Sequence, residues 1–462
     1  MGYEALTAVQ AQVIPLVFEK QDVIVQAQTG SGKTAAFAIP VCEQITLEQR
    51  NPQVLVLTPT RELAVQVKQD IANIGRFRKI RCAAVFGQQP MAQQRRVLSQ
   101  RVHVIVGTPG RTLDHIESGS INPAQINYLI LDEADKMLDM GFSDQVTAII
   151  DKLPGDRVTL VFSATMPEQI RQLCGKYMSN PVEVIIEPAG PAAAAIQQGW
   201  YAVEESAKFN LLQQIVATER PDSCILFCNT RDKADLLAAA CSKAGYLCGA
   251  LHGGMAQKER LTAMQGFKRG EFRFLIATDV AARGIHVAEI ALVINYDVPM
   301  DNESYVHRIG RTGRAGKDGR AITFVTVADR GALAAIEEFV QYAIPRLEPP
   351  ASTDVEQGRL ILENTRAQAA IKPDMADRLN SEITRIRINA GKKAKMRPGD
   401  ILGACTAIDG VSAGDVGIID VQQTCAYVEI LNNKGSLVVA ALQTVKIKGK
   451  VHTIKQVNFR SD

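Results

Sequence analysis

The sequence lacks the long apolar segments that a membrane-spanning protein needs. No apolar run approaches the ~18 consecutive residues required to cross a bilayer. The amino-terminal residues do not follow the basic, apolar, small-residue order of a secretory signal peptide. We therefore expect a cytoplasmic protein with no membrane partner.

Cysteines are present but lack the spacing of a disulfide framework. The nine cysteines are scattered, and no paired set of Cys and His residues suits a zinc site. Cys224 and Cys228 lie within an apolar, strand-like run, CILFC. Buried free thiols in a reducing compartment are therefore the expected state.

The length and the distribution of charge indicate several domains, one of them basic. At 462 residues, a prior of about 150 residues per domain gives roughly three domains. The stretch from Ile383 to Asp462 has twelve Lys and Arg against six Asp and Glu, a net charge of +6, whereas the whole chain carries +3. The rest of the chain is thus at −3. The basic tail points to a polyanionic partner, although charge alone does not distinguish this from an ordinary basic surface.

Short apolar runs separated by amphipathic stretches predict a parallel α/β sheet in the first part of the chain. Each run ends in small or polar residues, where the functional residues of such sheets collect. The runs are DVIVQA, VLVLTP, VHVIVGTP, YLILDEAD and TLVFSAT. EPAGPAAAAIQQ, from Glu187, interrupts this alternation and is predicted to be a linker.

A second alternation predicts another sheet of the same class, without a phosphate-binding loop of its own. Its runs are SCILFCNT, YLCGALHGG, FRFLIATDV, LVINYDVP and AITFVTV. A polar stretch containing EPPAST follows and predicts a linker with some helix, and the final part reads as a small α+β domain. We expect domains at residues 1–187, 196–345 and 383–460, with a linker at 346–382.

Residues 27–34 read AQTGSGKT between an apolar strand and an apolar helix, which is typical of a phosphate-binding loop. Glycines let backbone N–H groups approach phosphates, and the following helix adds positive potential. Lys33 is predicted to reach the β- and γ-phosphates, and the Thr34 hydroxyl to bind Mg²⁺. The predicted nucleotide-binding residues of this loop are Gln28, Thr29, Gly30, Ser31, Gly32, Lys33 and Thr34.

A cluster of acids ends the apolar run LILDEAD. Asp132, at the strand end, suits the Mg²⁺ shell, and Glu133 suits orientation of the attacking water. A solvated acidic turn would not explain why the acids close a buried strand downstream of a phosphate-binding loop. A third motif, HRIGRTGR at residues 307–314, lies beyond the linker, so it is predicted to supply catalytic arginines from another domain.

These motifs resemble those of the DEAD-box RNA helicases of superfamily 2. The resemblance covers nearly all of residues 1–345 and includes four further motifs. They are PTREL (Pro59–Leu63), TPGR (Thr108–Arg111), SAT (Ser163–Thr165) and ATDVAARGI (Ala277–Ile285). The resemblance implies two RecA-like domains on either side of a cleft in which ATP and single-stranded RNA bind.

The resemblance also implies roles for individual residues. Gln10 would read adenine while Tyr3 packs on the base, and Arg311 and Arg314 would contact the γ-phosphate. The residues implied to couple the ATP state to RNA are Asp135, Ser163, Thr165 and His307, and those implied to contact the nucleotide from the second domain are Asp279 and Gly284.

RNA contacts are implied on both helicase domains. On the first domain they are Arg61, Thr108, Gly110 and Arg111, and on the second they are Arg260 and Arg283, together with Asn229–Arg231 and Gln257. Family members hold RNA mainly by its backbone, so this core is not expected to read sequence.

The tail carries a dense basic run. AGKKAKMRPGD packs Lys392, Lys393, Lys395 and Arg397 into six residues, and KIKGK follows at 446–450. Such clusters bind phosphate, but they also occur on solvated faces. The tail resembles the RNA-binding domain of the DbpA/YxiN type of helicase, a divergent RRM, which implies a hairpin of 23S ribosomal RNA as the partner. Tyr427 is the one candidate for base stacking on a central strand, and a core position would suit it equally.

Three features depart from the family pattern. The sequence opens directly on GYEALTAVQ, without the aromatic that usually precedes it, and Leu6 stands where the family has Pro. His286 stands where the family has an Asp expected to contact the ATP ribose. A neutral imidazole can donate one hydrogen bond but cannot replace a carboxylate, so we expect weakened nucleotide affinity.

We therefore expect a monomeric, ATP-dependent RNA helicase that acts on ribosomal RNA during ribosome assembly, with ATP as substrate and Mg²⁺ as cofactor. Three alternatives remain: an ATP-gated RNA clamp or annealer, a DNA-directed motor of the same superfamily, and an RNA-binding scaffold with little unwinding. The intact set of predicted catalytic residues argues against the scaffold. It comprises Lys33, Asp132, Glu133, Arg311 and Arg314.

Overall fold

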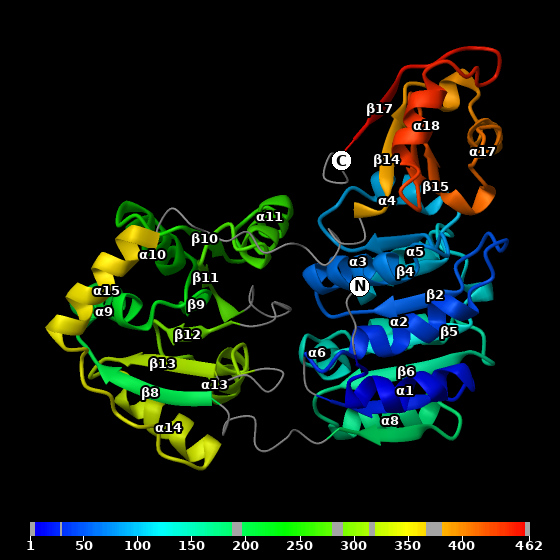
Figure 1. Ribbon diagram of the computed structural model, residues 1–462. Helices are drawn as coiled ribbons and strands as arrows, with labels where there is room; N and C mark the ends of the chain where they lie inside the picture. The colour runs from blue at the N-terminus through cyan, green and yellow to red at the C-terminus, as the bar shows by residue number, and fades with distance from the viewer. Residues whose placement is uncertain are drawn as a thin grey trace.

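Three β-sheets organise the chain into three domains (Figure 1). The computed structural model describes residues 5–27, 30–186, 196–279, 290–313, 319–365 and 381–457. The first sheet has seven strands and the second six, and every strand pair in both is parallel. The third has four antiparallel strands. The predicted fold class, two tandem RecA-like domains and a small α+β domain, is confirmed.

The first domain is a parallel sheet of order β3-β4-β2-β5-β6-β1-β7 with helices on its faces. Its strands are β1 (Val23–Gln26), β2 (Val54–Leu57), β3 (Cys82–Val85), β4 (Val104–Gly107), β5 (Tyr128–Asp132), β6 (Val158–Ser163) and β7 (Val182–Ile185). Its helices are α1 (Ala8–Phe18), α2 (Lys33–Gln44), α3 (Arg61–Ile74), α4 (Met91–Leu98), α5 (Pro109–Glu117), α6 (Ala134–Asp139), α7 (Ser143–Ile150) and α8 (Glu168–Tyr177), with a 3₁₀ turn, η1, at Pro123–Gln125.

The central strands of this sheet are buried on both faces. Val54 and Val56 of β2 point into one hydrophobic cluster, whereas Leu55 and Leu57 point into the other. Burial on both sides explains why this strand reads as a continuous apolar run. β3 and β7, which were not predicted, are the edge strands, and five of their eight residues are incompletely buried.

The second domain has a sheet of order β10-β11-β9-β12-β13-β8. Its strands are β8 (Ile196–Ala202), β9 (Cys224–Phe227), β10 (Cys248–Leu251), β11 (Phe274–Ala277), β12 (Leu292–Asn295) and β13 (Gly319–Val325). Its helices are η2 (Glu205–Ala207), α9 (Lys208–Glu219), α10 (Arg231–Lys243), α11 (Gln257–Lys268), α13 (Asn302–Ile309) and α14 (Arg330–Val340). β8 was not predicted, because its polar residues resemble the linker that precedes it.

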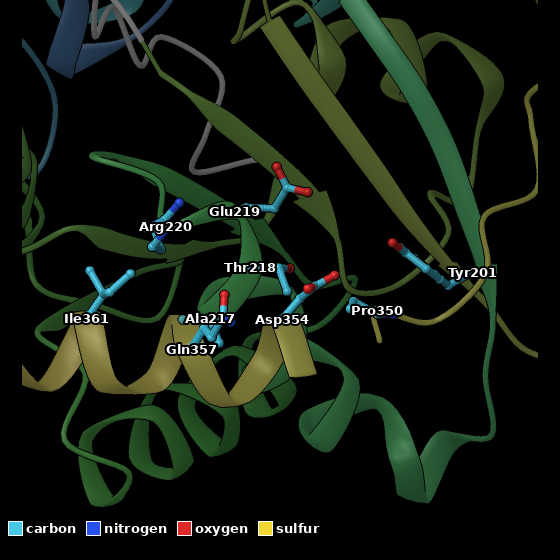
Figure 2. Close-up of a pocket in the computed structure, with 10 residues that line it drawn as sticks. Tyr201, Ala217, Thr218, Glu219, Arg220, Pro350, Asp354, Gln357 and Ile361 are labelled. Carbon is cyan, nitrogen blue, oxygen red and sulfur yellow. The ribbon is translucent and has the colours of Figure 1, made fainter. Parts of the chain in front are cut away.

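Helix α15 (Ser352–Thr365) follows the second domain and packs directly against α9. Gly358 makes this approach possible, because a Cβ atom there would lie 1.9 Å from the carbonyl oxygen of Ala217. A hollow of about 410 Å³ remains beside the contact, lined by residues of α9, α15 and β8 (Figure 2). At least this part of the predicted linker is therefore an ordered helix on the second domain.

The C-terminal domain has a sheet of order β15-β16-β14-β17 covered on one face by two helices. Its elements are β14 (Thr384–Ile388), η3 (Lys392–Ala394), α17 (Pro398–Thr406), η4 (Ala413–Asp415), β15 (Val416–Val421), β16 (Ala426–Ile430), α18 (Gly435–Leu442) and β17 (Ile454–Gln456). Along β14 and β16, every second residue points into the core, and these residues include Ile386, Ile388 and Val428. In Figure 1 this domain lies against the α3–α4 side of the first domain.

The cysteines agree with the expectation of free thiols. All nine cysteines are free, and each is buried or half-buried. Burial raises the pKa of the Cys42 thiol to about 12, so this thiol stays protonated at neutral pH. Among the residues that the structure describes, no helix is both long and apolar enough to cross a membrane.

Candidate nucleotide and RNA site

The order of strands in the first sheet separates two groups of motifs. The phosphate-binding loop, DEAD and SAT follow β1, β5 and β6, which are adjacent strands. PTREL and TPGR follow β2 and β4, which lie on the other side of β5. Because the strands are parallel, both groups lie at the same edge of the sheet, side by side.

The phosphate-binding loop leads into α2 through two glycines in left-handed conformation. Gly30 has φ 90° and Gly32 has φ 91°, values that L-residues rarely adopt. The Lys33 side chain is buried, and its Nζ donates to the carbonyl oxygen of Ala27, 2.9 Å away. Ser31 and Thr34 are half-buried at the start of α2. The Lys33 ammonium group thus lies within the loop that is predicted to bind the phosphates.

Gln10 connects the first helix to this loop. Its amide oxygen accepts from the Thr7 backbone N–H (3.0 Å), and its Nε2 donates to the Gly32 carbonyl (3.3 Å). The side chain is only 2% exposed, and a Cβ on Gly32 would come within 2.6 Å of its Nε2. Gln10 therefore fixes α1 against the phosphate-binding loop through hydrogen bonds that sequence reasoning did not anticipate.

Asp132 and Glu133 are buried at the end of β5. Burial raises the pKa of Asp132 to about 6; the Glu133 carboxylate adds to this shift, and Lys33 opposes it. Asp132 Oδ1 is buried without a hydrogen-bond partner in the described part of the chain. Glu133 has left-handed backbone torsions, φ 54° and ψ 52°, and its Oε1 lies 2.8 Å from Lys136 Nζ. Such a conformation is costly for a residue with a side chain and is held by its surroundings.

Asp135 joins the DEAD motif to SAT. Its Oδ2 accepts hydrogen bonds from Ala164 N (3.0 Å), Thr165 N (2.9 Å) and Thr165 Oγ1 (3.0 Å). In return, its backbone N–H donates to Ser163 Oγ (3.2 Å). Three of the four predicted coupling residues thus form one hydrogen-bonded unit.

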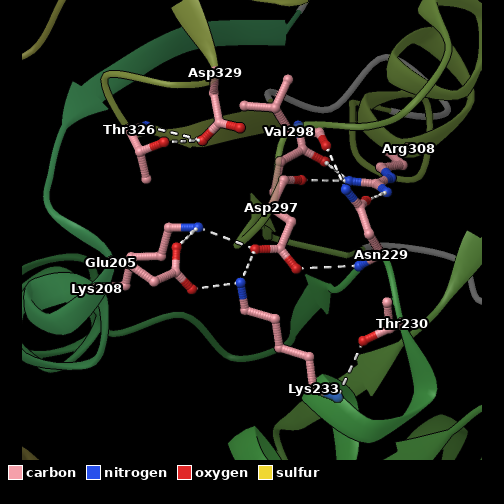
Figure 3. A network of polar contacts seen from close by, with 11 residues as sticks. Glu205, Lys208, Asn229, Thr230, Lys233, Asp297, Val298, Arg308, Thr326 and Asp329 are labelled. Atoms are coloured by element: carbon pink, nitrogen blue, oxygen red, sulfur yellow. Dashed lines mark hydrogen bonds and ion pairs between the residues drawn. The ribbon is translucent and has the colours of Figure 1, made fainter.

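A buried arginine, Arg308, forms hydrogen bonds with residues from several motifs of the second domain (Figure 3). The Arg308 guanidinium is 1% exposed and donates to both carboxylate oxygens of Asp279, each at 2.6 Å. It also donates to Asn229 Oδ1 (2.8 Å) and to the Asp297 carbonyl (2.7 Å). Asp279, predicted to contact nucleotide, is therefore engaged in a two-point pair with this arginine.

The carboxylate of Asp297 extends this network toward α9 and α10. Its oxygens accept from the buried Lys208 (3.0 Å), from Lys233 (2.5 Å) and from the Asn229 backbone N–H (3.2 Å). These hydrogen bonds lower the pKa of Asp297 even though its burial acts in the opposite direction. Sequence reasoning did not identify this network, which comprises Arg308, Asp297, Lys208 and Lys233. The only signal for it in the sequence was that Arg308 is the first arginine of HRIGRTGR.

Arg311 is oriented toward the first domain. Its side chain is 5% exposed, and Nε donates to the His307 carbonyl (3.2 Å). Burial lowers the pKa of Arg311, and the negative charge of Glu133 opposes this shift. The arginine is thus close enough to the DEAD motif to interact electrostatically with it. The side chain of His307, on α13, is exposed.

Helices α3 and α11 meet across the two helicase domains. Glu62 accepts from Gln257 Nε2 (3.0 Å) and pairs with Arg260 (3.0 Å), while Arg61 donates to Gln257 Oε1 (3.4 Å). Lys268 adds a bond to Gln66 (2.7 Å). Predicted RNA-binding residues from both domains therefore come together around Glu62, a residue that sequence reasoning did not single out.

The TPGR segment begins helix α5 next to these arginines. Thr108 is the N-cap residue, and Gly110 has open space where a Cβ would be. Arg111 donates to the Gln89 carbonyl (2.9 Å) and to Gln94 Oε1 (3.1 Å), and it pairs with Asp114 (3.4 Å). Burial lowers the pKa of Arg61; the nearby charges of Arg260 and Arg111 add to this effect, and Glu62 opposes it. Three predicted RNA-binding arginines thus lie close together.

The basic run of the C-terminal domain is exposed. Lys392, Lys393, Lys395 and Arg397 occupy η3 and the start of α17. Lys448 of KIKGK donates to the Lys395 carbonyl (2.6 Å) and pairs with Asp400 (3.2 Å), so the two basic segments are adjacent. Seven predicted positions lie outside the described residues: Tyr3, Gln28, Thr29, Arg283, Gly284, His286 and Arg314.

Family models match all three domains. Residues 7–173 match the DEAD/DEAH box helicase model, residues 207–316 the helicase conserved C-terminal domain, and residues 385–456 the DbpA RNA binding domain.

Two curated relatives match over almost their whole length. The chain is 48% identical over 461 residues to the ATP-dependent RNA helicase DbpA of Bacillus subtilis (strain 168), which covers 99% of this chain and 96% of that protein. The ATP-dependent RNA helicase DbpA of Escherichia coli (strain K12) is 38% identical, with 98% and 95% covered. Among solved structures, S. cerevisiae Dbp5 bound to RNA and ADP BeF3 is similar with a TM-score of 0.67 and 31% identity, over 78% of this chain and 94% of that one. The chain belongs to the DEAD-box family, as an ATP-dependent RNA helicase of the DbpA type with a C-terminal RNA-binding domain.

Proposed function

We propose that this helicase remodels 23S ribosomal RNA during assembly of the large ribosomal subunit, and that its C-terminal domain directs it there. The observation that carries the proposal is the exposed basic run on a domain that matches the DbpA RNA binding model. Four cations within six residues, next to those of KIKGK, suit the phosphates of a folded RNA. The protein would act as a monomer in the cytoplasm.

ATP hydrolysis is proposed to take place between the phosphate-binding loop and α13. Lys33 would leave the Ala27 carbonyl to bind the β- and γ-phosphates, and Glu133 would orient the attacking water. Arg311, which already faces the DEAD motif, would stabilise charge on the γ-phosphate together with Arg314. Gln10 would read the adenine from its position beside Gly32.

The residues at the end of β5 fit a divalent cation. Asp132 has a buried carboxylate oxygen without a hydrogen-bond partner in the described residues, and its raised pKa reflects missing compensation for its charge. The described residues contain no group of three or more His, Cys, Asp or Glu side chains that could hold a metal. Asp132 and Thr34 would hold Mg²⁺, which would supply charge neutralisation for the phosphates of ATP.

RNA is proposed to bind across both helicase domains. Arg61, Arg111 and Arg260 already lie close together, and Thr108 and Gly110 begin α5 beside them. The likeness to Dbp5 bound to RNA and ADP BeF3 supports this assignment. Asp135 would pass the state of the DEAD motif to Ser163 and Thr165 through the bonds described above.

The RNA-stimulated ATPase rate tests the target. It should be measured with a 23S hairpin fragment, with an unrelated hairpin of equal length and without RNA. Strong stimulation by the fragment alone is expected. Equal stimulation by both RNAs would support RNA-dependent ATPase activity but would contradict ribosomal RNA as the specific target. A strand-displacement assay with ATP and with a non-hydrolysable analogue would separate unwinding from clamping.

A further inference from the structure

The C-terminal sheet has an outer face that its own helices do not cover. Strands β14 and β16 and the second half of β15 alternate between core residues and residues of this face. The outer positions include Arg385, Arg387, Asp420, Tyr427 and Glu429, all half-buried. These side chains pack partly against one another, and the face as a whole is left accessible to another part of the chain.

A basic loop of the first domain contacts Glu429 on this face and also contacts η4 and the backbone of the neighbouring edge strand β15. The loop between α3 and β3 reads RFRKIR at residues 76–81. Arg76 forms an ion pair with Glu429 at 3.5 Å, and the two side chains are 8% and 16% exposed. Lys79 Nζ donates to the Ala413 carbonyl (3.0 Å), and Arg81 donates to the Ile419 carbonyl.

The contact is matched in charge. Four of the six loop residues are cationic. Arg76 and Arg81 interact with the carboxylates of Glu429 and Asp420, whereas Arg78 pairs with Glu43 of its own domain. One oxygen of each carboxylate, Glu429 Oε2 and Asp420 Oδ1, is buried. Complementary charges that are partly removed from water favour one orientation of two surfaces over others.

The outer face also has little room for a stacked base. The Arg385 guanidinium lies over the Tyr427 ring, 4.5 Å from its centroid. The one aromatic predicted for base stacking therefore already has a planar cation on its ring. By contrast, the basic run at Lys392–Arg397 is exposed and lies outside this contact.

We propose that the outer face of the C-terminal sheet is a docking surface for the RFRKIR loop of the first helicase domain. RNA is then left to the basic run of η3 and α17. The loop precedes β3, so it lies at the amino end of that strand, opposite the edge that carries PTREL and TPGR. Docking therefore leaves the RNA-binding edge of the helicase uncovered and holds the tail in one position at the opposite edge of the same sheet.

Cross-linking in the full-length chain tests the contact. Lys79→Cys and Ala413→Cys place thiols on the two sides, and a short bismaleimide should join them within one chain. Arg76→Glu or Glu429→Arg, each added to this pair, should lower the ratio of docked to undocked protein roughly tenfold. The combined charge swap should restore most of it. The parent chain without the two new cysteines controls for the native thiols.

Arg78→Glu is the matched control, because Arg78 lies in the same loop but bonds to Glu43 and the Ile45 carbonyl of its own domain. It should leave the cross-link unchanged. Absence of the cross-link, equal loss in this control, or a charge swap that restores nothing would each overturn the proposal. Thermal unfolding of each variant must show that it is folded.

A second measurement separates docking from RNA binding. Affinity for a hairpin RNA should fall at least fivefold in Lys393→Ala, whose cross-link should persist. Tyr427→Ala and Arg385→Ala should stay within twofold of the parent in RNA affinity. The opposite pattern would make the sheet face an RNA platform and would refute the proposal.

Discussion

Replacing Arg308 with alanine should unfold the second helicase domain at a much lower temperature. The side chain is 1% exposed and donates to Asp279, Asn229 and the Asp297 carbonyl. Its removal leaves the buried side of the Asp279 carboxylate without its cation. Breaking one partner of a buried ion pair costs about 3–5 kcal/mol, a large part of the ~5–15 kcal/mol that stabilises a domain.

Calorimetry can measure this loss of stability as a change in melting temperature. For a domain of this size, 1 kcal/mol shifts the melting temperature by about 2–4 °C, so Arg308→Ala should lower it by roughly 6–20 °C. Arg308→Lys keeps the charge but loses the two-point geometry, and it should fall between the variant and the parent. Arg330→Ala, at an exposed site in α14, is the matched control and should change stability by at most about 0.5 kcal/mol.

The double variant Arg308→Ala/Asp279→Ala completes the test. If the loss arises from the unpaired, half-buried carboxylate of Asp279, removing Asp279 as well should recover part of the stability lost in Arg308→Ala. If Arg308→Ala had the same melting temperature as the Arg330→Ala control, this account of the network would be refuted.

Four further predictions follow from the site. Asp132→Asn should abolish ATPase activity yet stabilise the first domain at pH 8 by up to about 3 kcal/mol, because the pKa of Asp132 in the folded protein, about 6, lies above the usual 3.8. This gain in stability should vanish as the pH falls through 6 toward 3.8. Unfolding measured at several pH values will test this. Thr165→Ala loses one bond to Asp135 and should reduce strand displacement far more than RNA-stimulated ATPase rate, and equal losses would contradict a coupling role. Lys393→Ala should lower the slope of log affinity against log salt by about 0.7–0.9 if that lysine contacts a phosphate, as titrations at several salt concentrations can measure. His286→Asp should lower the KM for ATP, and an unchanged KM would remove the ribose explanation.

The sequence was most informative where both faces of a strand are buried. The central strands β2 and β5 are continuous apolar runs, so their positions and the motifs that follow them were predicted correctly. The edge strands β3, β7 and β8 were missed. Polar residues interrupt β7 and β8, and β3, CAAV, consists mostly of small residues, so none of the three forms a long apolar run. Periodicity reports the local environment of a segment, which is why it identifies the interior of a sheet better than its margins.

Side-chain partnerships far apart in the chain were less predictable. The bond from Asp135 to Thr165 joins two motifs that had both been identified. Arg308, in contrast, has partners in loops after three different strands, and nothing near it in the sequence marks it as buried. Glu62 was passed over for a similar reason, since its partners Gln257 and Arg260 lie on the other helicase domain.

The packing of α15 on α9, which depends on Gly358, sets the reach of the tail. With that helix fixed to the second domain, only the chain between Thr365 and Ser381 connects it to the C-terminal domain. At no more than ~3.6 Å per residue, this connection cannot exceed about 58 Å. An RNA held by the tail is therefore confined to a small volume around the helicase cleft, which raises its local concentration there. A bulky residue at position 358 would lengthen the tether and dilute that RNA without altering any residue that touches it.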